Sequence, residues 1–532
     1  MKTVRPGVML DCSRGAVYAV PAVKKFIDVL AKMGYGSLQL YTEEVYTVEG
    51  EPYFGYMRGR YSPEELKELD AYAAGQGIEL IPCIQTLAHL GGLTRWPQAY
   101  GDITDTADIL LAGEERTYAL IDKMFAACAA NFKSRRINIG MDEAHFVGLG
   151  KYLDKHGYEN RFEILAKHLT RVAEIAKKYG FRPMMWSDMF FRLANHGNYY
   201  VEEGKEVPIE EVAKLVPENV DLIYWDYYSR DGAHYDRMIR AHKKFKNGLV
   251  FAGGAWCWTG FAPCNGFSIE ANRAAVASCI EHGVDNIFIT VWKDDGSESS
   301  LFSVLPALFA SAEFCRGNFD DALIHARFKE VCGMEWDEFL RIGLPNLPAG
   351  KNEITNPCKY MLYSDPFYGI FDYTVFEGGR LMYAQAKAAL EESAGNAEYG
   401  YFFRTLADLC GVMELKYDLG VRTRALYREK NMDGLCLLLN DYRECERRLN
   451  AFYESFRAQW MREAKGFGFE RHDIRIGGLM QRLKNCSRLL EDYLRGEIDC
   501  IEELEQDIIA DGEKGKTICF NNWLRTATIC NS

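Results

Sequence analysis

The feature that most constrains the fold of this chain is a short apolar segment followed by an amphipathic one, repeated eight times. The short segments predict strands, and apolar positions three and four residues apart in the longer segments predict helices. The predicted pairs are 7–14 with 20–33, 38–44 with 63–74, 79–86 with 115–132, 136–145 with 161–179, 182–188 with 209–216, 220–227 with 235–245, 248–256 with 269–282, and 286–292 with 301–314. An open doubly wound sheet rarely has so many units and usually has a glycine-rich first turn. The sequence therefore predicts an α/β fold, a (β/α)8 TIM barrel.

The alternation stops after Pro345, and the sequence between residues 374 and 511 becomes helical and charged. Long amphipathic segments at 376–393, 435–463 and 476–494 predict an α-helical C-terminal domain. With 532 residues, of which 48% are hydrophobic, the chain is long enough for two domains. We expect a catalytic barrel over 1–345 and a helical domain over 346–532. The second domain offers core or dimer contacts, or a lid over the barrel.

Composition narrows the classes of partner. The formal charge of −13 disfavours nucleic acid and anionic membranes. The first residues lack the apolar run of a signal peptide, and no uninterrupted apolar stretch predicts a membrane span. The 16 cysteines include no Cys-x-x-Cys pair, which argues against a zinc ribbon or a disulfide framework. We therefore expect a cytoplasmic protein with reduced thiols.

Polar and aromatic side chains gather where the predicted strands end, the edge of a TIM barrel that carries the active site. Five of the nine tryptophans lie at the ends of strands five to eight, which predicts aromatic walls around a ligand. Aromatic walls with carboxylates and an arginine suit a sugar, whose apolar face stacks on rings. His89 could instead be a core histidine, and Arg14 could merely bridge two strand ends. The strand-end residues are Arg14, Glu43, His89, Asp142, Glu143, Trp186, Asp188, Trp225, Asp226, Trp256, Trp258, Trp292 and Asp294.

Two of these residues, Asp142 and Glu143, are adjacent in sequence. The charge of one carboxylate disfavours ionisation of the other, so such a pair supplies one acid and one base near neutral pH. The plainer interpretation is that Asp142 caps a following helix and Glu143 pairs with a surface lysine.

The stretch Asn138-Ile139-Gly140-Met141-Asp142-Glu143 resembles the His-x-Gly-small-Asp-Glu signature of the family 20 glycoside hydrolases, the β-N-acetylhexosaminidases. The resemblance covers residues 7 to about 315, and the helical tail resembles a bacterial intracellular branch acting on both GlcNAc and GalNAc. It implies that Arg14 and Asp294 bind outer sugar hydroxyls and that Glu43 and His89 orient the catalytic glutamate. It also implies an acetamido pocket lined by Trp186, Trp225 and Trp292.

The sequence departs from the family pattern at several of these positions. Asn138 replaces the usual histidine and Met141 the usual small residue. Strand seven ends at Trp256 and Trp258 without the family's tyrosine, which donates a hydrogen bond to the acetamido carbonyl. Tyr227, Trp256 Nε1 and Trp258 Nε1 are the candidates for that donor, and Glu298 is a candidate to share hydroxyl recognition with Asp294.

The resemblance implies a retaining exo-β-N-acetylhexosaminidase that removes terminal β-linked GlcNAc or GalNAc without a metal or cofactor. In this scheme the acetamido group of the substrate is the nucleophile, Asp142 orients it, an oxazolinium ion forms, and Glu143 is the acid and then the base. Two alternatives are a metal-dependent hydrolase or isomerase using Glu43, Asp142, Glu143 and His145, and a non-catalytic glycan-binding barrel. A homodimer is compatible with the sequence.

Overall fold

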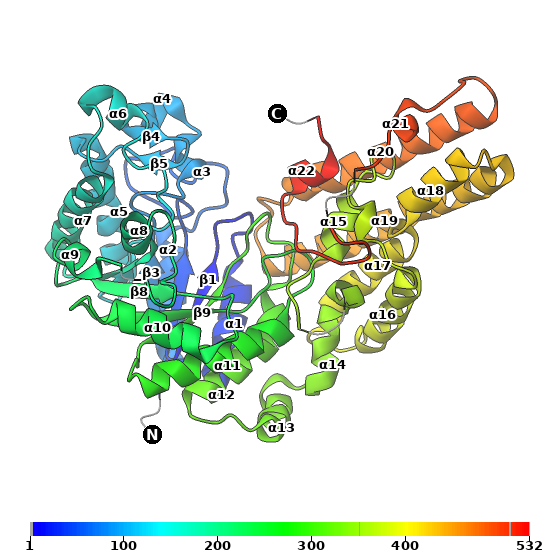
Figure 1. The fold of residues 1–532 in the computed structure, drawn as a ribbon. Helices are drawn as coiled ribbons and strands as arrows, with labels where there is room; N and C mark the ends of the chain where they lie inside the picture. The colour runs from blue at the N-terminus through cyan, green and yellow to red at the C-terminus, as the bar shows by residue number, and fades with distance from the viewer. Residues whose placement is uncertain (1–3, 206, 350–351, 510–511, 531–532) are drawn as a thin grey trace.

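The computed structural model describes residues 4–205, 207–349, 352–509 and 512–530. Eight parallel strands close into a barrel in the order β1-β10-β9-β8-β7-β6-β3-β2, which confirms the predicted fold (Figure 1). The barrel strands are β1 (Gly7–Asp11), β2 (Ser37–Tyr41), β3 (Glu79–Cys83), β6 (Arg136–Asn138), β7 (Arg182–Trp186), β8 (Asp221–Trp225), β9 (Leu249–Gly254) and β10 (Ile287–Val291).

Helices surround the barrel and bury their apolar faces against it. Local sequence signals set their ends. Helix α2, for example, starts with a capping box between Ser62 and Glu65, and α1 ends at Gly34, whose φ of 83° suits glycine. The main surrounding helices are α1 (Val20–Met33), α2 (Pro63–Gly75), α5 (Glu115–Asn131), α7 (Arg161–Lys178), α10 (Gly232–His242), α11 (Asn265–Glu281) and α12 (Leu305–Cys315), the last preceded by η2 (Leu301–Val304).

The barrel differs from the predicted pattern mainly in its connections. The predicted strands were too long, because the chain turns into loops at their polar ends. The segment before α5 adds a hairpin and short helices, the connection between β6 and α7 adds one short helix, and the fifth unit has two short helices. These elements are α3 (Gly91–Thr94), α4 (Pro97–Tyr100), η1 (Gly101–Ile103), β4 (Thr104–Thr106), β5 (Ile109–Leu110), α6 (Lys151–His156), α8 (Asp188–Ala194) and α9 (Ile209–Ala213).

The C-terminal region is helical, as predicted, and packs beside the barrel (Figure 1). Its longest helix, α19, has 32 residues and lies along α20. The elements are α13 (Asp321–Cys332), α14 (Trp336–Leu340), η3 (Arg341–Ala349), α15 (Pro357–Tyr363), η4 (Asp372–Thr374), α16 (Gly379–Ser393), α17 (Gly400–Lys416), α18 (Leu419–Arg428), α19 (Met432–Glu463), α20 (Glu470–Leu494), α21 (Glu502–Glu505) and α22 (Trp523–Ala527).

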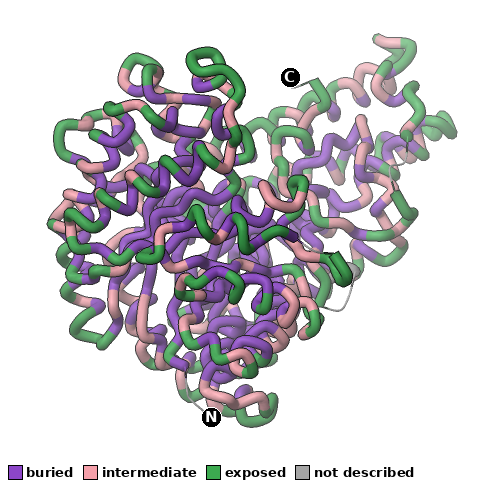
Figure 2. Tube along the Cα trace, turned by 60° about the vertical axis from the view of Figure 1, so that its left-hand side comes forward, coloured by how far each residue is buried: buried purple, intermediate pink, exposed green. Residues whose placement is uncertain are grey.

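Buried residues fill the barrel and continue between the C-terminal helices (Figure 2). A separate apolar cluster, which includes Met9, Ile81, Met184, Ile223 and Phe288, occupies the barrel interior. This packed interior supports the residues that end the strands. None of the helices within the described ranges is both long and apolar enough to cross a membrane.

Candidate active site

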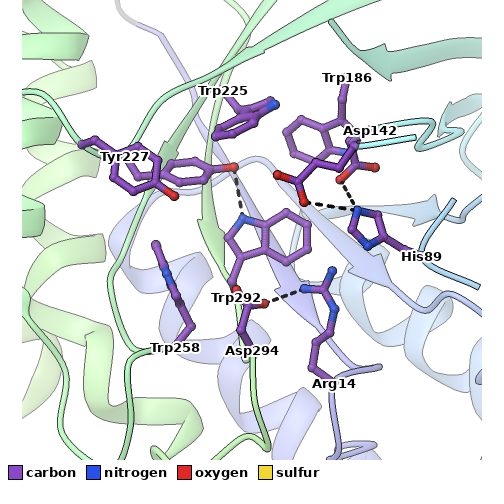
Figure 3. Close-up of a pocket in the computed structure, with 11 residues that line it drawn as sticks. Arg14, His89, Asp142, Trp186, Trp225, Tyr227, Trp258, Trp292 and Asp294 are labelled. Carbon is purple, nitrogen blue, oxygen red and sulfur yellow. Dashed lines mark hydrogen bonds and ion pairs between the residues drawn. The ribbon is translucent and has the colours of Figure 1, made fainter. Parts of the chain in front are cut away.

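A pocket opens at the carboxyl ends of the barrel strands (Figure 3). Ten of its eleven lining residues were predicted from the sequence, and Tyr228 is the additional one. The lining residues are Arg14, His89, Asp142, Glu143, Trp186, Trp225, Tyr227, Tyr228, Trp258, Trp292 and Asp294. The predicted residues Glu43, Trp256 and Glu298 lie outside this lining.

Asp142 is held from two sides at the bottom of the pocket. Gln85 Nε2 donates a hydrogen bond to Oδ1 at 2.7 Å, and His89 Nε2 lies 3.2 Å from Oδ2. Burial alone would raise the pKa of Asp142, but His89, Gln85 and Arg14 outweigh burial, and the pKa falls below its usual range. Asp142 therefore keeps its negative charge at neutral pH.

His89 is the partner of Asp142 and is not a core histidine, since it lines the pocket. Burial favours its neutral form, but the charge and hydrogen bonding of Asp142 raise the pKa of His89 to about 9. Its Nε2 also lies 3.7 Å from Glu143 Oε2. One protonated imidazole thus forms ion pairs with both carboxylates.

Glu143 is the more open member of the carboxylate pair, with 43% of its side chain exposed against 10% for Asp142. Its backbone has a φ of 51°, and its N–H donates to Asp188 Oδ2 at 3.1 Å. Asp188 is fully buried, and burial together with the charges of Asp142 and Glu143 raises its pKa to about 7. The strained turn is thus fixed through a buried carboxylate.

The plainer interpretation of the two carboxylates is wrong. No helix starts at this turn, because the next one, α6, begins at Lys151, so Asp142 caps no helix. The ion-pair partner of Glu143 within the described chain is His89 rather than a surface lysine.

Arg14 also lines the pocket. Its Nη1 lies 2.7 Å from Asp294 Oδ1 and its Nε 3.2 Å from Glu43 Oε1. Glu43 is buried behind Arg14 and accepts a hydrogen bond from Tyr41 at 2.9 Å. Glu43 therefore contacts Arg14 and does not itself line the pocket. Arg14 both lines the pocket and links strand ends.

Aromatic rings form the remaining wall of the pocket. Trp225 and Tyr227 stack with ring centroids 5.4 Å apart, and Trp186 and Trp292 lie 5.9 Å apart. Trp292 Nε1 donates to Tyr227 Oη at 3.1 Å, so the Tyr227 oxygen is the acceptor in this contact. Trp186 Nε1 is buried without a hydrogen-bond partner among the described residues.

Trp256 and Glu298 have other partners. The indole N–H of Trp256 donates to the Tyr227 carbonyl at 2.7 Å, so it is already engaged, and its ring stacks on Trp258 at 4.2 Å. Glu298 is buried and pairs with Lys359 at 2.9 Å and Arg475 at 3.2 Å, both from the C-terminal region. These two residues support the pocket from behind.

The C-terminal region also holds the loop that carries Asp294. Arg475 lies 2.6 Å from Asp295 Oδ1, and His472 Nε2 lies 2.9 Å from the carbonyl oxygen of Gly296. Asp295 has a φ of 51°. The described part of the helical region thus supplies no lining residue to this pocket but fixes one of its loops.

Sequence reasoning missed Gln85, Tyr228 and the contact of Asp188 with Glu143. Gln85 is the next-to-last residue of a predicted strand, Tyr228 directly follows one, and Asp188 ends one, so position at a strand end was the available signal. In the described part of the chain, no three His, Cys, Asp or Glu side chains are grouped to hold a metal ion. His145, expected for a metal site, lines a different pocket.

Two family models match the chain. The model for the glycosyl hydrolase family 20 catalytic domain matches residues 5–236, and that for the Glycoside Hydrolase 20C C-terminal domain matches residues 337–518. Together the two matches cover most of the barrel and of the helical region.

Individual proteins align with 62–63% of the chain. Hexosaminidase D from Bos taurus is 22% identical over 361 residues, 62% of this chain and 95% of the relative. Hexosaminidase D from Homo sapiens is 22% identical over 373 residues, 63% of this chain and 71% of the relative. A crystal structure of a GH20 exo β-N-acetylglucosaminidase from Vibrio harveyi, in complex with N-acetylglucosamine, aligns with 17% identity and a TM-score of 0.47, over 62% of this chain and 58% of that one.

Proposed function

The chain belongs to glycosyl hydrolase family 20, and we propose that it is a retaining exo-β-N-acetylhexosaminidase that removes terminal β-linked GlcNAc or GalNAc by substrate-assisted catalysis. The observation that carries this proposal is the pair Asp142 and Glu143, which are adjacent in sequence but differ in environment. Asp142 is buried and paired, whereas Glu143 is open to solvent.

The two environments suit two different tasks. Glu143 faces the open side of the pocket, where a leaving group would lie, and acts as the general acid on the glycosidic oxygen. Asp142, charged and held by Gln85 and His89, accepts a hydrogen bond from the acetamido N–H and steers the carbonyl oxygen onto the anomeric carbon. The resulting oxazolinium ion carries positive charge, which Asp142 stabilises. Water activated by Glu143 then opens this ion with net retention.

The rest of the lining matches a single terminal sugar. Arg14 and Asp294, 2.7 Å apart, offer donors and acceptors to ring hydroxyls, and the aromatic wall stacks against the sugar and its acetamido methyl group. The Tyr227 hydroxyl supplies the hydrogen bond to the acetamido carbonyl, because it lines the pocket and accepts rather than donates in its contact with Trp292, while Trp256 Nε1 is engaged.

We also propose that the protein acts in the cytoplasm. All 16 cysteines are unpaired in the structure, and most are buried. Unpaired thiols in this number suit a reducing compartment.

Chromogenic β-glycosides test the proposed function. The 4-nitrophenyl glycosides of β-GlcNAc and β-GalNAc should be hydrolysed, while the β-glucoside should be nearly inert because it lacks the internal nucleophile. Comparable kcat/KM values for the β-glucoside and β-GlcNAc substrates would refute substrate assistance. No hydrolysis of either N-acetylhexosaminide would refute the activity itself.

A further inference from the structure

A second pocket lies on the other side of the turn that carries Glu143. It has a volume of about 590 Å³ and is formed by the loop after β6, the start of α7, and α8 with the residues that follow it. Its polar and aromatic lining includes His145, Tyr158, Asn160, Arg161, Arg192 and His196, and none of the described carboxylate side chains lines it. We call it the basic pocket.

The positive charge of the basic pocket is poorly balanced. Arg161 forms no ion pair with any described residue, and its guanidinium donates only to the carbonyl oxygens of Val147 and His145. The nearest acid to Arg192 is the buried Asp188, with its Oδ2 3.4 Å from Nε. In a chain with a net charge of −13, this pocket thus brings together two arginines and two histidines without an acid among its described lining residues.

The arginines of the basic pocket also act on its neighbouring groups. Burial lowers the pKa of the Arg161 guanidinium. Burial, Arg192 and Arg161 also lower the pKa of His145, against the opposing effect of Glu143. A bound anion would relieve both effects, because it favours the charged forms of these side chains.

The basic pocket is connected to the catalytic turn by two direct contacts. The His145 N–H lies 2.6 Å from the Glu143 carbonyl oxygen, and Asp188 contacts both the Glu143 N–H and Arg192. A general acid lies between the sugar that is retained and the group that leaves. The basic pocket thus adjoins the turn that carries the proposed general acid.

We propose that the basic pocket binds an oxyanion on the leaving-group sugar, so that the preferred substrates carry N-acetylhexosamine β-linked to an acidic sugar. This proposal rests on the proposed function. Arginine presents a planar fork that matches a carboxylate or a sulfate ester. Tyr158, which is 75% exposed, and Phe162 provide ring faces for the sugar that carries the charge.

The test compares three disaccharides with β-GlcNAc joined through the same linkage to glucose, glucuronic acid or glucose 6-sulfate. We expect kcat/KM to be about tenfold or more higher for an acidic partner than for glucose, because hydrogen bonds to charged groups are the stronger ones. The advantage should shrink in 0.5 M NaCl, which screens charges. An advantage of glucuronide alone identifies a carboxylate, and an advantage of the sulfate alone identifies a sulfate ester.

Arg161→Gln and His196→Gln should each reduce the ratio of acidic to neutral kcat/KM. Lys167→Gln is the matched control, since Lys167 lies on the same helix as Arg161, is 66% exposed, and does not line the pocket. This control should keep the wild-type ratio.

The outcomes separate the two proposals. If 4-nitrophenyl β-GlcNAc is hydrolysed but the wild-type ratio is near one, the basic pocket proposal is wrong and the proposed function stands. An acidic preference that survives unchanged in both Arg161→Gln and His196→Gln would also overturn it. An enzyme inactive on 4-nitrophenyl β-GlcNAc refutes the proposed function instead.

Discussion

His89 Nε2 lies 3.2 Å from Asp142 Oδ2, and each residue moves the pKa of the other toward its charged form. The pair is therefore an ion pair at neutral pH. It holds the charge of Asp142 at the position where the proposed mechanism needs a stable anion.

The first prediction concerns the pH dependence of stability. The His89 pKa rises from 6.5 to about 9, so its contribution is fully present below pH 6.5 and is lost as pH rises through about 9. The Asp142 pKa falls below 3.8, so its contribution is present above pH 3.8 and is lost as pH falls through the lowered value. The pair thus stabilises the fold most between about pH 4 and 6.5.

Urea unfolding at pH 5.5 and 9.5 measures this effect. The wild-type protein should lose about 2–3 kcal/mol more unfolding free energy over this range than His89→Gln, because the variant has no titrating side chain at position 89. Equal losses in the two proteins would mean that His89 does not form a charged pair with Asp142.

The second prediction concerns Asp188, whose carboxylate accepts the Glu143 N–H at 3.1 Å. Asp188→Ala removes this acceptor from a turn with a φ of 51° at Glu143, so the general acid should lose its position. We expect kcat to fall about 10- to 100-fold with a smaller change in KM, because the contact supports the acid rather than substrate binding.

Asp188→Asn is the control for this prediction, because its amide oxygen can still accept the hydrogen bond. It should retain more of kcat than Asp188→Ala. A folded Asp188→Ala protein with wild-type kcat would show that the turn needs no such support.

Most of the fold was predictable from the sequence because barrel strands and helices alternate with clear periods. The pocket was predictable because all eight strands end at one face, so Arg14 and Asp294 meet although 280 residues separate them. The partners of Glu298 could not be predicted, since Lys359 and Arg475 come from helices whose packing on the barrel follows no sequence period. Likewise, the hydrogen bond from Trp256 Nε1 to the Tyr227 carbonyl oxygen could not be predicted, because apolar periodicity does not fix the conformation of a loop.

The third prediction concerns this junction between the helical region and the barrel. Arg475 is 5% exposed and pairs with Asp295 and Glu298. Arg475→Gln should lower the unfolding free energy by about 3–5 kcal/mol, as for other buried pairs that lose one partner. It should also raise KM, because Asp295 adjoins Asp294 in the pocket.

Kinetics and thermal unfolding of Arg475→Gln test this link. Arg462→Gln, on α19 and with its guanidinium over the Tyr401 ring, is a comparison with the same change of charge. A folded Arg475→Gln protein with wild-type KM would show that this junction does not affect sugar binding.

The last prediction separates the roles of the two adjacent carboxylates. If Glu143 is the general acid, Glu143→Gln should lose most activity on poor leaving groups and less on 2,4-dinitrophenyl substrates, which depart with little protonation. If Asp142 orients the acetamido group, Asp142→Asn should be impaired on every leaving group. It should also bind a thiazoline mimic of the intermediate more weakly, because its negative charge is gone.

A series of aryl β-GlcNAc substrates with graded leaving-group pKa measures this difference, and added azide extends it. The reversed pattern, with leaving-group dependence in Asp142→Asn, would exchange the two roles. Azide should not restore Asp142→Asn by forming an inverted glycosyl azide, because the nucleophile remains on the substrate. An inverted azide product from this variant would show that Asp142 attacks the anomeric carbon itself, and substrate assistance would have to be abandoned.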